Sequence, residues 1–233
     1  MNEGKIKDSI NKIRKLLSQM EILKDYKISN CNELDFDKKY SKDFKDIMFS
    51  DDYPNLYRTA MKNGDYDILL SNDSFFQFSY EKTTKKIRYQ YYPNPFENMT
   101  YENFVKEQFG NEEGNEKSYL PEYEQYIDEN TIIKYNKWFS IRYDYDKNEH
   151  QKYIHPISHL HIGLNNSTRI PLDYIVTPQL FVYIVCMLQF KDEWKKVVND
   201  AKLIEEYKTI KKKALEIENN ILDRDEKNII FIN

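Results

Sequence analysis

Several short segments between residues 65 and 172 alternate apolar and polar residues with a period of two, and this alternation constrains the fold more than any other feature. The clearest are KIRYQYYP at residues 86–93 and SIRYDYD at residues 140–146. Successive side chains of a strand point to opposite faces of a sheet, so this period predicts strands with one apolar and one polar face. Further strands are predicted in DYDILLSNDSFFQFSYE (residues 65–81, two strands joined by a turn), SHLHIG (158–163) and TRIPL (168–172).

Helical patterns lie on both sides of the predicted strands. Apolar residues three and four apart predict a first helix over residues 4–24. Thr177 followed by Pro178 is typical of the start of a buried helix. Shorter helices are predicted over residues 53–62, 100–109 and 121–128. Spaced apolar residues from Asp192 to Asp223 predict one long, charge-rich helix.

These elements predict an α+β fold, with an antiparallel sheet of about five to six strands, helices packed on one face and a long C-terminal helix. The 20 tyrosines and 13 phenylalanines predict an aromatic-rich core. Three parts are expected along the chain. Residues 1–30 form an N-terminal helix that packs on the C-terminal helix, residues 31–190 form the α+β core domain, and residues 191–233 form the long helix and tail.

Composition and charge exclude several classes of protein. The net charge of -4, with acids and bases interspersed, lacks the basic footprint of a duplex-binding protein, so any contact with a nucleic acid or nucleotide must be local. No apolar run approaches the ~20 residues of a membrane-spanning helix. The two cysteines, Cys31 and Cys186, are interpreted as reduced thiols. We therefore expect a cytoplasmic protein with no membrane partner.

All four histidines of the chain lie between residues 150 and 161. Alternation in SHLHIG places His159 and His161 on the face opposite its apolar residues, and alternation in TRIPL does the same for Arg169. The apolar residues of both strands can be buried against one core only if the pairing places apolar residues opposite apolar residues. The register expected here pairs Ile162 with Ile170 and Leu160 with Leu172, leaving residues 165–167 as the loop. His159, His161 and Arg169 are then predicted to share one face.

The same alternation adds polar side chains from the other strands to this face. They are Arg88, Gln90, Arg142 and Asp144, together with Gln77 and Ser79. This convergence is the main functional signal in the sequence. The alternative interpretation is a solvated face without function, which antiparallel sheets commonly have.

These residue types suit phosphoryl or nucleotidyl transfer without a metal ion or another cofactor. We predict that His159 and His161 transfer protons and that Arg169 stabilises charge on the phosphate, the three acting as catalytic residues. A cationic neighbour also favours the neutral imidazole that a general base requires. The predicted substrate-binding residues are Arg142, Arg88, Asp144 and Gln77.

A metal site is the alternative role for the same histidines. Two imidazoles at i and i+2 on a strand can reach one ion, but a catalytic zinc site needs about three protein ligands. The third ligand would be His155, Asp144 or Asp173, and the sequence leaves this choice open. His150, flanked by charged residues, is expected in an exposed loop.

The strand segments, in their order along the chain, resemble the motifs of a bacterial family known only as domain of unknown function 2290. The likeness covers roughly residues 60–190 and centres on HPISHLHIGLNNSTRIPLDYIVTPQLFVYIV at residues 155–185, so the terminal helices lie outside it. The family-like positions are Ser158, His159, His161, Gly163, Arg169 and Pro171. The resemblance implies a place in bacterial mobile and phage-defence neighbourhoods, without an established activity.

Two classes of function follow from these observations. The first is a nuclease or other phosphodiester-processing effector of a phage-defence or toxin–antitoxin system, acting through the histidine and arginine face. The second is a non-catalytic binding partner or scaffold in a defence complex, docking through the N- and C-terminal helices. More than thirty residues of amphipathic helix need a partner, inside the chain or outside it. We favour the enzyme.

Overall fold

The computed structural model describes residues 1–50, 52–97, 101–110, 119–130, 132–133, 139–163, 168–218 and 221–230. By its internal contacts the chain divides into two units. Met1–Pro93 and Phe139–Asn233 form the first unit, and Asn94–Trp138 forms the second. The candidate site lies in the first unit.

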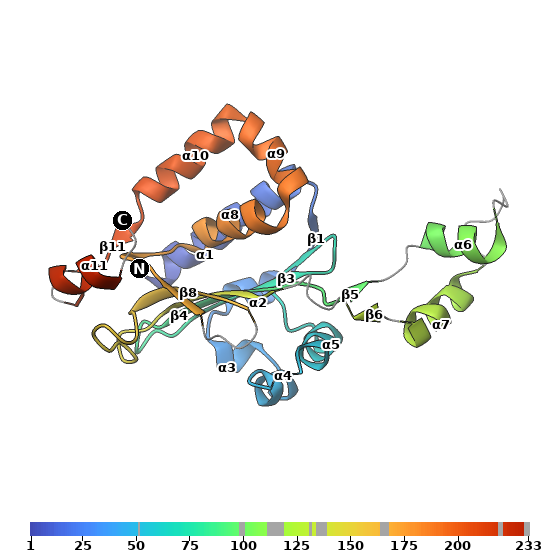
Figure 1. Ribbon diagram of the computed structural model, residues 1–233, viewed down its shortest axis with the longest axis horizontal. Coiled ribbons are helices and arrows are strands. Elements are labelled where there is room, and N and C mark those ends of the chain that lie inside the picture. Colours follow the sequence, from blue (N-terminus) through green and yellow to red (C-terminus); the bar gives the residue numbers. More distant parts are fainter. Residues whose placement is uncertain are drawn as a thin grey trace. The chain divides into compact units, whose positions relative to one another are not determined.

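An antiparallel sheet of seven strands, in the order β1-β2-β3-β4-β7-β8-β9, forms the centre of the first unit (Figure 1). Its strands are β1 Leu23–Tyr26, β2 Ile68–Leu70, β3 Phe75–Tyr80, β4 Ile87–Tyr92, β7 Ile141–Tyr145, β8 Ser158–Ile162 and β9 Thr168–Pro171. The predicted α+β fold with an antiparallel sheet is confirmed. The sheet is larger than the five to six strands expected, because an unpredicted strand, β1, begins inside the predicted first helix and pairs with β2.

Nine helices of the first unit fall within the described residues. They are α1 Glu3–Gln19, α2 Ile28–Asn32, α3 Phe36–Lys39, α4 Lys42–Ile47, α5 Tyr53–Asn63, α8 Pro178–Gln189, α9 Lys191–Asn199, α10 Ala201–Lys212 and α11 Arg224–Ile230. None of the helices in the described part of the chain combines the length and the apolar character that crossing a membrane requires.

Helices α1 and α8 cover the face of the sheet that carries the apolar residues of the alternating pattern (Figure 1). Tyr89 of β4 and Tyr143 of β7 lie there with ring centroids 5.5 Å apart, and Phe181 of α8 packs on Tyr89 at 5.9 Å. Thr177 caps α8 as predicted, because its side chain accepts the N–H of Leu180. The core is aromatic-rich, as the composition predicts.

The opposite face is partly covered as well, by α4 and α5 (Figure 1). Phe44 of α4 packs on Tyr92 with ring centroids 6.1 Å apart, and Tyr57 of α5 packs on Phe75 at 5.7 Å. The expectation of helices on one face is therefore corrected. Aromatic residues at one end of β3 and β4 give these helices an apolar surface, and the polar residues of the same face lie farther along the strands.

The first helix is shorter than the predicted span of residues 4–24. It ends at Gln19, where Glu21 adopts a left-handed conformation with φ 59° and its N–H donates to the carbonyl of Ser18 at 3.1 Å. This turn reverses the chain into β1, so Leu23 pairs with Leu70 of β2. The helical spacing of apolar residues stops at Met20, and the strand that follows is too short to show a period of its own.

The single long helix predicted from Asp192 to Asp223 is also corrected. Asp200 has extended backbone angles and caps α10 by accepting the N–H of Lys202 and Leu203, so α9 and α10 are separate helices. The chain then forms β11, Leu215–Glu216, which pairs with β10, Tyr174–Ile175. The stripe of apolar residues is therefore used for packing inside the chain, with Val197 and Leu203 both buried in the core.

The second unit contains α6, Tyr101–Phe109, and α7, Leu120–Asn130, which confirm the two predicted helices of this region. Strands β5, Phe96–Glu97, and β6, Ile132–Ile133, form an antiparallel pair. Phe104 holds the helices together through ring contacts with Tyr123 at 5.4 Å and Tyr126 at 5.0 Å. The predicted cap at Thr100 lies outside the described residues.

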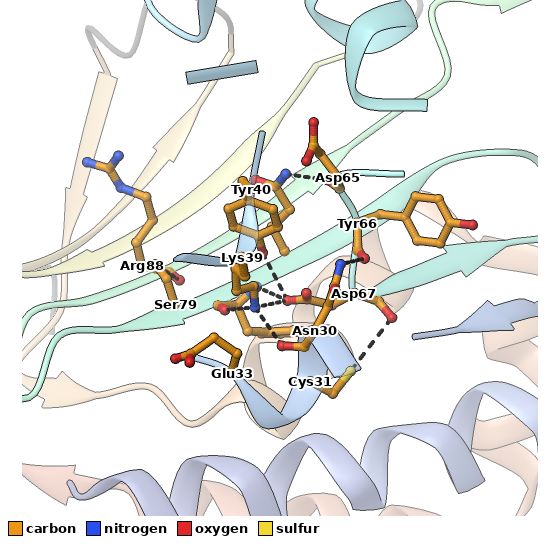
Figure 2. A network of polar contacts seen from close by, with 12 residues as sticks. Asn30, Cys31, Glu33, Lys39, Tyr40, Asp65, Tyr66, Asp67, Ser79 and Arg88 are labelled. Carbon is orange, nitrogen blue, oxygen red and sulfur yellow. Dashed lines mark hydrogen bonds and ion pairs between the residues drawn. The ribbon is translucent and has the colours of Figure 1, made fainter. Parts of the chain in front are cut away.

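A buried ion pair joins α3 to the sheet (Figure 2). Lys39 Nζ lies 2.8 Å from Asp67 Oδ2, with side-chain exposures of 1% and 0%. The same carboxylate oxygen accepts the hydroxyl of Tyr40 at 3.1 Å and the N–H of Phe78 at 2.6 Å, and Lys39 also donates to the carbonyls of Asn30 and Phe78. Burial raises the pKa of Asp67 although the charge of Lys39 opposes this. The pair fixes the loop before α4 against β2 and β3.

Candidate functional site

The pairing of β8 with β9 decides which side chains share a face. Leu160 lies opposite Ile170 and Ile162 lies opposite Thr168, so the predicted register is wrong by two residues. Gly163 leaves the ladder with φ 97°, its N–H donating to the carbonyl of Ser140 on the side of β7. A shift of two residues keeps each side chain on its face, so His161 and Arg169 share one face as predicted, and the observed register makes them direct neighbours. The predicted loop residues 165–167 lie outside the described residues.

Two buried imidazoles form the centre of the site. His159 and His161 are 1% and 2% exposed, and their Nε2 atoms lie 2.9 Å apart. The Nδ1–H of His159 donates to the carbonyl of Pro156 at 2.7 Å, which leaves its Nε2 with a free lone pair. His161 Nε2 must then carry the proton shared between the rings, and it also lies 3.3 Å from Asp144 Oδ2. This arrangement places one acceptor nitrogen and one donor nitrogen together.

Asp144 connects the imidazoles to two arginines from neighbouring strands. Arg88 Nε donates to its Oδ1 at 3.1 Å and Arg142 Nε donates to its Oδ2 at 2.7 Å. Burial alone would raise the pKa of Asp144, but the hydrogen bond from His161 and the two guanidinium groups hold it well below its usual range. Burial lowers the pKa of Arg142, and Asp144 opposes that shift. The cluster therefore contains one carboxylate and two guanidinium groups, an excess of positive charge.

His159 is held neutral by its surroundings. Burial, and after it the neighbouring His161, lower the pKa of His159 to about 4, while Asp144 opposes the shift. His155 packs against His159 with ring centroids 5.0 Å apart, and burial followed by the charge of Arg169 lowers its pKa as well. Neutral imidazole is the form that accepts protons and binds metal ions.

The lowered pKa of His159 predicts that the protein loses stability in mild acid. The unfolded chain takes up this proton near pH 6.5 and the folded chain only near pH 4, so the unfolded state binds more protons between these values. The contribution is complete above pH 6.5 and is lost as the pH falls toward 4. We expect the free energy of unfolding to drop by about 2–3 kcal/mol between pH 7 and pH 4.5 from this group.

The measurement is urea unfolding at both pH values in the presence of a chelator, for the wild type and His159→Asn. Asparagine can keep the hydrogen bond to Pro156 while removing Nε2. The other titratable side chains around the ring, His155, His161 and Asp144, remain in the variant. An equal loss of stability in both proteins would show that His159 is not responsible.

Among the three candidates for a third metal ligand, the structure brings Asp144 to the histidine pair. Asp144, His159 and His161 each offer one ligand atom, and these atoms lie within 4.8 Å of one another. Asp173 is exposed in the turn after β9 and is not part of this group. His155 lies beside His159 without joining the three.

Two predicted site residues lie apart from this cluster. Arg169 is adjacent to His161 but its side chain is exposed, and its catalytic role stays a prediction. Gln77 is buried, and its amide donates to the carbonyl of Asp65 at 2.5 Å. Gln77 therefore contributes to packing near the buried ion pair, which the sequence pattern alone could not distinguish from substrate binding.

Ser158, a family-like position, belongs to the opposite face of β8. Its hydroxyl donates to the carbonyl of Tyr174 at 2.8 Å and lies 3.0 Å from the hydroxyl of Tyr143. That tyrosine in turn accepts the N–H of Val176 at 3.1 Å. Ser158 thus joins β8 to the segment that leads into α8, and it is not positioned as a nucleophile for the cluster.

His150 is not in an exposed loop, and this expectation is corrected. Its side chain is 15% exposed, its Nδ1 lies 3.0 Å from the carbonyl oxygen of His155, and its Nε2 lies 3.4 Å from Glu226 of α11. The C-terminal helix packs over this segment, which the separate patterns of the two regions do not reveal. His150 supports the loop that carries His155.

Comparison with protein families adds one finding. A family described as "Uncharacterized conserved protein (DUF2290)" matches residues 18–233. The chain belongs to this family. The DUF2290 match confirms the resemblance and extends it beyond residues 60–190 to residues 18–233, so the C-terminal helices lie within it and most of α1 lies outside it. Comparison with curated proteins and with solved structures gave no match.

Proposed function

We propose that the protein is a phosphodiester-processing enzyme, a nuclease-type effector acting in the bacterial cytoplasm within a phage-defence or toxin–antitoxin system. The observation that supports the chemical part is the buried contact of two imidazoles with a carboxylate that holds two guanidinium groups. The place in a defence system rests on the family resemblance.

The charge of the cluster favours an anionic substrate. Arg88 and Arg142 each give one Nε–H to Asp144, and a guanidinium has further N–H groups that can reach a phosphate. Their side chains are 22% and 12% exposed, so both are held in place yet open to solvent. A phosphate bound there would lie near the imidazoles, which supply proton transfer or hold an ion that activates water.

Arg88 also gives the site a route to the surface. It lines a groove of about 710 Å³ together with Ser79, Lys86 and residues of the segment between α2 and α3. In Figure 2 the Arg88 side chain points away from the buried Asp67. Phe49, also on this groove, is 78% exposed, and an exposed ring can stack on a nucleobase. The groove also carries carboxylates, among them Glu33 and Asp35, so a nucleotide is expected to bind with its phosphate at the Arg88 end.

Expression in a bacterium tests this proposal. We expect the wild type to slow growth and to degrade cellular RNA, and His159→Ala/His161→Ala to do neither, because the variant lacks both imidazoles of the cluster. Asp173→Asn serves as a control that removes an exposed titratable group outside the cluster. Equal effects of the wild type and the double variant on growth and RNA would contradict the proposal.

The alternative function, a non-catalytic partner that docks through its terminal helices, loses its main support. That argument required a long amphipathic helix in need of a partner. Helices α9 and α10 instead pack on α8 within the chain, with Trp194 and Tyr207 in ring contact with Tyr183. The enzyme therefore remains the favoured proposal.

A further inference from the structure

We propose that His159, His161 and Asp144 form a binding site for one divalent transition-metal ion of the zinc class. The inference deepens the proposed function and rests on it for the chemical use of the ion. The sequence leaves this possibility open with three choices of third ligand, and the fold selects Asp144.

The three ligand atoms already surround a space of suitable size. The Nε2 atoms of His159 and His161 are 2.9 Å apart, and His161 Nε2 lies 3.3 Å from Asp144 Oδ2. Ligands at the usual zinc distances in a tetrahedral site are separated by about 3.4 Å. A small opening of the imidazole pair, together with a shift of the His161 proton from Nε2 to Nδ1, would therefore admit the ion.

Hydrogen bonds to groups other than the three ligands orient the ligand side chains. A metal-bound histidine commonly donates its other ring N–H to a backbone carbonyl or carboxylate, which fixes the tautomer and the ring orientation. His159 does so through Nδ1 to Pro156, and its Nε2 faces the other ligands. Arg88 and Arg142 hold the Asp144 carboxylate in the same way. Two of the three ligands thus have outer partners of the type found at metal centres.

His155 provides a second, independent observation. Its Nδ1 is buried and has no hydrogen-bond partner within the residues that the structure describes. A buried polar atom without a partner calls for an explanation, and an ion is one of the recognised ones. The ring lies beside His159, with centroids 5.0 Å apart. The unpartnered atom therefore lies on a ring beside the site, while the three ligand atoms leave the fourth position of the ion open.

The ligand set and the surrounding charge define what the site would bind. Imidazole suits zinc, copper, iron and nickel, whereas magnesium and calcium favour oxygen ligands. A divalent ion next to Arg88 and Arg142 would add positive charge, so the loaded site would favour an anion at its open position. A hydroxide or the oxygen of a phosphodiester has the required charge.

Zinc titration of the purified full chain tests the inference. The protein is first treated with a chelator and desalted, then titrated with ZnCl₂, and bound zinc is measured by elemental analysis after a second desalting. We expect about one zinc per chain and a rise in Tm of about 5–10 °C at zinc concentrations near 100 times Kd. MgCl₂ at the same concentration is expected to leave Tm unchanged. A wild type that retains no zinc and shows no shift would overturn the inference.

A variant pair locates the ion. His159→Asn removes the Nε2 ligand, keeps a donor for Pro156, and is expected to weaken zinc binding by at least about tenfold. Asp173→Asn removes an exposed carboxylate outside the ligand group and is expected to bind zinc like the wild type. Zinc binding by His159→Asn at the wild-type affinity would place the ion elsewhere and refute the proposed site.

The outcome for the ion can be separated from the outcome for catalysis. Zinc binding that depends on His159, without hydrolysis of any phosphodiester, would support the metal site and contradict the proposed function. Hydrolysis that persists in chelator-treated protein, with no zinc retained on titration, would support the proposed function and overturn the metal site.

Discussion

Asp67→Asn is expected to destabilise the protein by about 3–5 kcal/mol, the cost of breaking a buried ion pair by removing one partner. The substitution leaves the ammonium of Lys39 buried with 1% of its side chain exposed and removes its carboxylate partner at 2.8 Å. The bond from Tyr40 to the carboxylate is weakened as well. Urea unfolding at neutral pH measures the change in the free energy of unfolding.

A neighbouring lysine provides the matched control. Lys38→Met removes a charge whose side chain is 69% exposed and which pairs with Asp35 on the surface. Its effect is expected to stay within about 0.5 kcal/mol, because exposed ion pairs contribute little. A second variant, Lys39→Met/Asp67→Leu, should recover much of the loss, since both charges are then absent. Similar stabilities for Asp67→Asn and Lys38→Met would contradict the structural role of the buried pair.

Asp144→Asn is expected to lower both stability and activity. Arg88 and Arg142 would lose their shared counter-charge, and we expect destabilisation by about 2–3 kcal/mol, below the value for a fully buried pair because both guanidinium groups reach solvent. Phosphodiester hydrolysis is expected to fall by about 10²–10³-fold, as for the loss of one positioned electrostatic group. Unfolding and hydrolysis are measured on the same preparation.

Asp146→Asn is the control for this change. Asp146 follows the same strand and pairs with Lys86 at 2.7 Å, outside the imidazole cluster. We expect a loss of no more than about 1 kcal/mol and unchanged hydrolysis, because the lysine is 35% exposed. If the two variants hydrolyse the substrate equally well, Asp144 has no part in the reaction.

The alternating strands could be predicted from the sequence because their apolar face is strongly specified. Tyr89 and Tyr143 must be buried together, and a one-residue slip would expose them. The sequence alone therefore predicts which face of β4 and β7 is buried. The register of β8 with β9 does not follow, since a two-residue shift keeps every side chain on its face. Ile170, at 37% exposed, is too open to specify the pairing.

The missed features of the fold depend on contacts between distant segments. Helix α9 ends at an Asn–Asp pair that is a recognisable capping signal, but a continuous apolar stripe on both sides conceals it. Strand β11 forms by pairing with β10, where Leu215 lies opposite Ile175, forty residues earlier in the chain. The periodicity of apolar residues within one segment cannot predict a pairing between segments so far apart.

The candidate site was predictable in its residue types and less so in its geometry. Alternation placed His159, His161, Arg142 and Asp144 on one face, and they do meet there. To predict that Asp144 lies between two arginines, one must know that the strands are ordered β4-β7-β8. The sequence pattern does not give this order. The same order separates Gln77 from the cluster, because β3 lies beyond β4 and Gln77 donates to the carbonyl of Asp65.

Hydrolysis of bis(4-nitrophenyl) phosphate and of single-stranded RNA by the purified protein tests the central claim most directly. Wild type and His159→Asn are compared after circular dichroism has shown equal folding, with and without added ZnCl₂. The account predicts hydrolysis by the wild type and a loss of at least about 100-fold in the variant. Equal rates for both folded proteins, or no hydrolysis by the wild type under any of these conditions, would contradict it.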